Sequence, residues 1–109
     1  MAYREIGIVI DKQPGVWTYP SGRQACPKTP AGRREYQRRI EAMWTRQRGL
    51  CCLCGRPIFL AESVFEHQDG RGHGGGNRDD RIEIDGKWIN GAACWKCNSE
   101  KGSKRINYN

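Results

Sequence analysis

The chain is organised around the stretch Phe65-Glu66-His67-Gln68-Asp69-Gly70-Arg71-Gly72-His73-Gly74-Gly75-Gly76-Asn77-Arg78-Asp79-Asp80. This stretch holds both histidines of the protein, a carboxylate beside the first of them, and a glycine-rich loop. Imidazole and carboxylate groups can bind a metal ion, and an imidazole can also move a proton near neutral pH. The stretch is therefore the first place in the chain to look for chemistry.

Two Cys-x-x-Cys pairs flank it, formed by Cys51, Cys54, Cys94 and Cys97. Four thiolates suffice for a closed tetrahedral zinc site, which has no open position for a substrate. We therefore expect a structural zinc ion that holds together the two ends of a ββα unit, because residues 55–93 form a longer insert than a simple zinc ribbon has. The alternative is two unrelated turns with reduced thiols.

The composition is that of a small protein with a thin core, which such a metal would stabilise. With 109 residues, of which 37% are hydrophobic and 14 are glycine, it can form one domain with a thin core. No apolar run is long enough to cross a membrane, and the N-terminus lacks the apolar core of a secretory signal. We therefore expect a cytoplasmic protein with reduced cysteines. Cys26 and Cys52 remain outside the two pairs.

The charge balance points to a polyanionic partner. The formal net charge is +7 and the isoelectric point is about 9.3. Seven basic and two acidic side chains lie in residues 28–48, which is most of the excess. The basic side chains there can form a solvated helix face, or a face that contacts nucleic-acid phosphates without choosing a sequence.

Local signals predict an α+β fold in a single domain. Residues 1–30 should form an irregular arm, with a strand over residues 4–12 and a proline-rich loop over residues 13–30. Thr29-Pro30 opens a basic helix over residues 31–49. One face of that helix carries Tyr36, Ile40, Met43 and Gln47, with Trp44 alongside.

The remaining core spans residues 50–104. The apolar residues Ile58, Phe59, Val64 and Phe65 should lead into its first strand. Asp85-Gly86 between alternating segments predicts a hairpin over residues 81–89. A second helix is expected from Ala92 to about Lys101.

The residue types around His67 suit phosphodiester hydrolysis. Such a reaction needs a base for water, a metal ion that stabilises charge on the phosphate and leaving oxygen, and a group that fixes the tautomer of the base. His67 suits the base, and Glu66 offers an oxygen ligand for Mg²⁺ or Mn²⁺. Strand neighbours point to opposite faces, so both serve one site only if the strand end twists. His73 is a further ligand or phosphate contact, or an exposed loop histidine.

These motifs together resemble the HNH endonucleases of the ββα-metal class. The resemblance rests on the first Cys-x-x-Cys pair, the acid-His pair, the Gly-rich loop ending Asn77-Arg78-Asp79-Asp80-Arg81, and Cys94-Trp95-Lys96-Cys97-Asn98-Ser99-Glu100-Lys101. It is similar to phage-type members and covers residues 50–104. It implies a fold of two antiparallel strands and a helix around one divalent ion, and cleavage of DNA to 5′-phosphate and 3′-hydroxyl ends.

The resemblance also implies a role for individual residues. Glu66 and Asn98 would bind the catalytic Mg²⁺ or Mn²⁺, and His67 would be the general base. Asn90 would be the structural middle residue that ties the loop to the hairpin and orients His67, with Asn77 as its rival. Apart from the resemblance, basic residues that flank the site are candidate phosphate contacts, namely Arg71, Arg78, Arg81 and Lys101, although Arg78 and Arg81 can instead pair with Asp79, Asp80 or Glu83.

Other functions fit the same composition. One is a non-catalytic zinc-ribbon module that only binds nucleic acid, and another is a zinc domain that docks on a protein partner such as a phage packaging machine. A homodimer is compatible with the sequence as well. The Glu66-His67 pair with Asn98 favours the enzyme, because binding alone does not need these residues.

Overall fold

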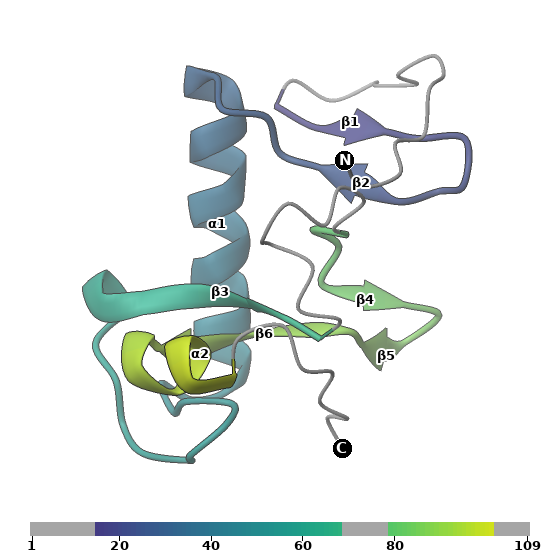
Figure 1. Ribbon diagram of the computed structural model, residues 1–109. Helices are drawn as coiled ribbons and strands as arrows, with labels where there is room; N and C mark the ends of the chain where they lie inside the picture. The colour runs from purple at the N-terminus through teal and green to yellow at the C-terminus, as the bar shows by residue number, and fades with distance from the viewer. Residues whose placement is uncertain (1–14, 69–78, 102–109) are drawn as a thin grey trace.

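A computed structural model of the protein describes residues 15–68 and 79–101 (Figure 1). The elements in chain order are β1 (Trp17–Thr18), β2 (Gln24–Ala25), α1 (Pro30–Arg46), the 3-10 helix η1 (Leu60–Glu62), β3 (Ser63–His67), β4 (Glu83–Ile84), β5 (Lys87–Trp88), β6 (Asn90–Cys94) and α2 (Trp95–Lys101). The described residues form a small α+β fold, as predicted, with antiparallel pairs β1–β2, β3–β6 and β4–β5. Neither helix has the length and apolar character that a membrane crossing requires within these residues.

Helix α1 begins as the sequence predicts. The extended Thr29 accepts a hydrogen bond at 3.0 Å from the N–H of Gly32 through its hydroxyl, and Pro30 takes the first helical position. The chain leaves the helix through Gly49, whose φ of +74° lies in the left-handed region that glycine adopts without strain. The predicted range 31–49 therefore includes the closing turn as well as the helix.

The core lies between α1 and the β3–β6 pair. Ile40 and Met43 of α1 pack against Phe65 of β3 and Ala92 of β6, with the predicted neighbours Tyr36 and Trp44 partly buried at the border. Within residues 15–68 and 79–101 this cluster has four buried members, so its apolar packing supplies limited stability.

The last helix begins later than the sequence predicted. Ala92 and Ala93 belong to β6 instead, and both are fully buried. Gln47 at the end of α1 helps to hold this strand, since its side-chain amide donates to the Ala92 carbonyl and accepts from the Ala92 N–H, both at 2.8 Å. Strand pairing with β3 and this amide satisfy the backbone, so α2 begins only at Trp95.

The predicted hairpin near residue 85 is confirmed. Strands β4 and β5 pair antiparallel with Asp85 and Gly86 between them. Both turn residues have positive φ, 51° and 81°, which is the backbone of a type I′ turn. Residues 13–30, predicted as loop, contain the short β1–β2 hairpin in their described part, and the predicted strand over residues 4–12 lies outside the described residues.

The prediction of an open basic helix face is wrong for Arg39, which is only 7% exposed. Its guanidinium donates to a Glu35 carboxylate oxygen at 2.7 Å, to the Asp80 carbonyl at 2.7 Å and to the Gln24 side-chain oxygen at 3.0 Å. Arg39 therefore ties β2 and the segment before β4 to α1, and its burial leaves little of the guanidinium available to a phosphate.

We expect Gly32→Ala to destabilise the protein, although alanine favours helices by about 1 kcal/mol over glycine. A Cβ at this buried position would collide with the carbonyl group of Pro27. Overpacking of this kind costs about 1–3 kcal/mol. Urea unfolding of the zinc-loaded protein measures the change, with the exposed Thr45→Ala as the control on the same helix. An unchanged unfolding free energy for Gly32→Ala would contradict the close approach.

Candidate functional site

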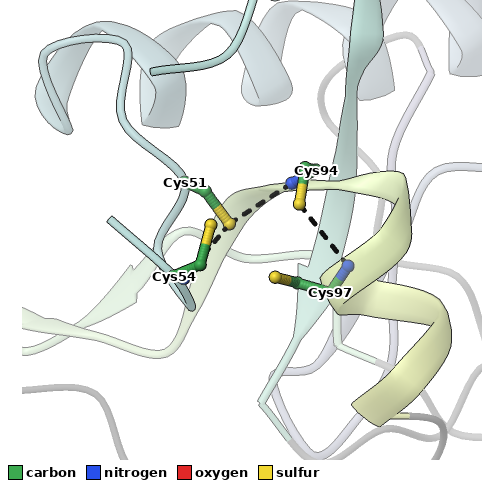
Figure 2. A group of neighbouring side chains, drawn as sticks. All are labelled: Cys51, Cys54, Cys94 and Cys97. Atoms are coloured by element: carbon green, nitrogen blue, oxygen red, sulfur yellow. Dashed lines mark hydrogen bonds between the residues drawn. The ribbon is translucent and has the colours of Figure 1, made fainter. Parts of the chain in front are cut away.

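The first cysteine pair lies in a tight turn that follows α1. The N–H of Cys51 donates to the Arg56 carbonyl at 2.8 Å, and the N–H of Gly55 donates to the Cys51 carbonyl at 2.9 Å. Gly55 has a φ of +76°, and a Cβ there would meet nothing within 4 Å, so backbone conformation and not space favours glycine. The turn brings the sulfurs of Cys51 and Cys54 side by side (Figure 2).

The second pair joins the end of β6 to the first turn of α2. The N–H of Cys97 donates to the Cys94 sulfur at 3.4 Å. Figure 2 shows the four sulfur atoms gathered between the turn and the helix, and all lie within 4.8 Å of one another. Cys54 is exposed, whereas the other three are buried or half-buried. The cluster therefore joins the chain after α1 to both β6 and α2.

This cluster can hold a metal, as the two cysteine pairs predict. Zn–S bonds of about 2.3 Å place tetrahedral sulfurs roughly 3.8 Å apart, so a small inward movement suffices. Burial opposes ionisation of Cys51, but its sulfur accepts the N–H groups of Cys54, Cys94 and Leu53 at 3.4–3.5 Å, which lowers its pKa to about 7. The pKa of Cys97 is raised by its hydrogen bond with Cys94, by burial and by the neighbouring thiolates. A bound cation favours the thiolate form of all four.

A second cluster lies at the end of β3. His67, its last residue, stacks on Phe65 with ring centroids 4.4 Å apart, and its Nε2 lies 2.7 Å from Oδ1 of the fully buried Asp80. The other oxygen of Asp80 accepts the N–H of Cys26 at 2.8 Å, and Arg39 binds its carbonyl. Asp80 is thus fixed from several directions, and it holds one edge of the imidazole.

Glu66 points to the other side of β3, toward α2. Its side chain is 1% exposed, and Oε2 lies 2.8 Å from Nζ of Lys101, which also donates to the His67 carbonyl at 2.7 Å. Asn98 precedes Lys101 by one helical turn, so the two residues share a face of α2. The structure thus places Glu66 beside the face that carries Asn98, and it places Glu66 and His67 on opposite faces of the strand.

Asn90 pairs with His67 in the β3–β6 register. Its side chain accepts the N–H of Gln68 at 3.0 Å and donates to the carbonyls of Asp79 and Arg81 at 2.7 and 2.6 Å. Asn90 therefore joins the two backbone segments on either side of residues 69–78. Its side-chain bonds go to these backbone groups, while the imidazole of His67 is held by Asp80.

The expected phosphate contacts have different outcomes. Arg71 and Arg78 lie outside the described residues, as do His73 and Asn77. Lys101 is buried, with 4% of its side chain exposed, so its ammonium faces Glu66 and not the solvent. Arg81 pairs with Asp79 at 2.6 Å, which is the alternative that the sequence left open, and this pair raises the pKa of the guanidinium.

The sequence pattern did not identify Asp80 as the partner of His67. It lies thirteen residues away along the chain, and that spacing matches no helix or strand period. The available signal was the acidic pair Asp79-Asp80, which follows the glycine-rich loop. The loop begins just after His67, so if Asn90 joins the two ends of the loop, Asp79-Asp80 must lie near His67. Comparisons with protein-family models, with curated proteins and with solved structures found no match to this chain.

Proposed function

We propose that the protein is a metal-dependent endonuclease that hydrolyses phosphodiester bonds of DNA in the manner of HNH enzymes. The observation that carries the proposal is that two successive residues at the end of β3, Glu66 and His67, each meet a buried charged partner. Removing charged groups from water costs several kcal/mol each, and buried pairs seldom repay this in stability. Such a cost in a chain with a small core is more readily explained by chemistry than by folding.

Each side chain has a role in this proposal. His67 is the base that takes a proton from the attacking water, because Asp80 occupies Nε2 and leaves Nδ1 for the reaction. The carboxylate of Glu66 and the amide oxygen of Asn98 are hard donors that suit Mg²⁺ or Mn²⁺. When bound there, the ion supplies charge stabilisation to the phosphate and the leaving oxygen. Lys101 must yield its contact with Glu66 to that ion.

The contact of Lys101 with Glu66 favours a second candidate, a zinc module that binds nucleic acid without cutting it. The ammonium at 2.8 Å already neutralises the carboxylate, so Glu66 needs no metal for electrostatic balance. If this candidate is correct, Mg²⁺ should not raise the melting temperature of the zinc-loaded protein. The nuclease should gain stability as Mg²⁺ binds to its folded state.

Cleavage of supercoiled plasmid tests the proposal. The zinc-loaded protein is incubated with Mg²⁺, with Mn²⁺ or without added divalent ion, and the nicked and linear products are separated on a gel. We expect cleavage only with an added ion, since the zinc site has no open position. His67→Ala, purified in parallel, should bind the plasmid without cutting it, which excludes a contaminating nuclease.

Two results would count against the enzyme. The first is a folded wild-type protein that cuts neither plasmid nor linear DNA with any ion. The second is equal cleavage by His67→Ala and wild type. Binding without cleavage would then leave the zinc module as the better description.

A further inference from the structure

The basic side chains of residues 28–46 divide into two groups, and the remaining one of the basic stretch, Arg48, is exposed just after α1. Arg38 and Arg39 share the carboxylate of Glu35 at 2.7 Å, and Arg46 pairs with Glu83 at the same distance. Pairing with Arg38, followed by Arg39, lowers the pKa of Glu35, so this acid stays ionised and its one negative charge is shared by the two guanidinium groups.

The second group precedes Glu35 and consists of Lys28, Arg33 and Arg34. These side chains are exposed, and within residues 15–68 and 79–101 they have no ion pair. The first turn of α1 contains no acidic residue that could neutralise them. No carboxylate therefore offsets their positive charge, whereas that of the first group is offset in part by Glu35 and Glu83.

A cavity of about 530 Å³ lies at the N-terminal end of α1, and two of these cations, Lys28 and Arg33, line it. Its apolar wall is formed by Cys26, Pro27 and Tyr36, and its polar groups come from Lys28, Arg33 and Gln37. No acidic residue lines it. A hollow with two open cations, a hydrogen-bonding amide and an apolar wall suits an anionic group that is carried on a partly apolar ligand.

This cavity adjoins the cluster around His67 along two routes. Tyr36 stacks on Phe65 with centroids 4.8 Å apart, and Phe65 stacks in turn on His67 at 4.4 Å. On the backbone side, the N–H of Cys26 binds the same Asp80 that holds His67. The rings of Tyr36, which lines the cavity, and Phe65 thus lie between the cavity and the imidazole of His67. A nucleic-acid strand that advances about 3.4 Å per nucleotide covers two such ring-to-ring distances in a few nucleotides.

We propose that this cavity binds a backbone phosphate of the substrate strand a few nucleotides from the cleavage point, with Lys28 and Arg33 as its contacts. The inference rests on the proposed function for the identity of the ligand, a nucleic-acid strand. Among the basic side chains of residues 28–46 it favours those at the N-terminal end, since Arg38, Arg39 and Arg46 already have carboxylate partners. Contacts of this kind fix the position of the strand without reading its sequence.

The test compares two charge-matched double variants. Lys28→Gln/Arg33→Gln removes the open cations of the cavity, and Arg38→Gln/Arg46→Gln removes two cations of the same helix that are already paired. Each is made in the His67→Ala background, loaded with zinc and kept free of Mg²⁺, so cleavage does not interfere. Fluorescence anisotropy gives Kd for a short labelled duplex over a series of salt concentrations, and thermal melting checks the fold.

Each neutralised phosphate contributes about 0.9 to the slope of log Kd against log salt, so the cavity variant, which loses one phosphate contact, should lose about 0.9 from that slope. The paired-cation variant should keep the parental slope. Equal slopes for the cavity variant and its parent, or no DNA binding by any protein, would overturn the inference. If the cavity variant loses the slope while wild type cuts nothing, the phosphate site stands and the nuclease proposal fails.

Discussion

Removal of metal from the four-cysteine site is expected to unfold the protein. Cys51 and Cys54 lie after α1, whereas Cys94 and Cys97 lie at the junction of β6 and α2, so the metal joins segments more than forty residues apart in sequence. Structural zinc contributes about 10–16 kcal/mol of binding free energy at neutral pH, and this free energy becomes folding free energy when the apo site is not preformed. The buried cluster of Ile40, Met43, Phe65 and Ala92, the one that the described residues form between α1 and the sheet, cannot replace such a contribution.

Thermal unfolding followed by circular dichroism checks this expectation. A chelator should abolish the cooperative transition, and zinc should restore it. Cys97→Ser should act as the chelator does, because it removes one of the four ligands. Cys52→Ser is the matched control, since Cys52 neighbours Cys51 but lies outside the cluster and should leave bound zinc unchanged. An apo protein that melts at the same temperature as the zinc-loaded one would show that the cluster has no structural role.

Much of the fold was predictable because its signals are local. The Thr29-Pro30 start of α1, the periodic face with Ile40 and Met43, and the Asp85-Gly86 turn each depend on residues within one or two turns of chain. The boundary between β6 and α2 was not predictable in this way. Ala92 and Ala93 favour a helix by propensity, and only pairing with β3 and the amide of Gln47 makes them a strand.

The candidate site was predictable in its residue types but not in its pairings. Spacing alone identified the four cysteines, since two Cys-x-x-Cys turns supply the ligands that zinc requires. The partners of His67 and Glu66 are Asp80 and Lys101, which come from distant segments that meet through tertiary packing. Sequence periodicity carries no information about such contacts, and Lys101 was for this reason expected to contact a phosphate and not Glu66.

Asp80→Asn is expected to reduce DNA cleavage to near the level of His67→Ala, a loss of about 10²–10⁴-fold if His67 is the general base. An ionised carboxylate only accepts hydrogen bonds, so Asp80 requires the hydrogen on Nε2 and leaves the lone pair on Nδ1. An asparagine amide can donate to Nε2 instead, and the hydrogen then moves to Nδ1, where it blocks the base. The volume of the side chain stays nearly the same, and one amide oxygen can still accept the N–H of Cys26.

A nitrogen-15 NMR spectrum of the imidazoles separates this effect from a loss of structure. The chain has only two histidines, so the resonances of His67 can be assigned by comparison with His67→Ala. We expect the Nε2–H tautomer in wild type and a shift toward Nδ1–H in Asp80→Asn, with DNA affinity and zinc content unchanged. Asp79→Asn is the control, because Asp79 pairs with Arg81 and should leave the tautomer as it is. An unchanged tautomer in a poorly active Asp80→Asn protein would mean that Asp80 acts through the fold alone. If Asp80→Asn changes the tautomer but the wild-type protein does not cut DNA, the inferred role of Asp80 in orienting His67 stands and the nuclease proposal fails.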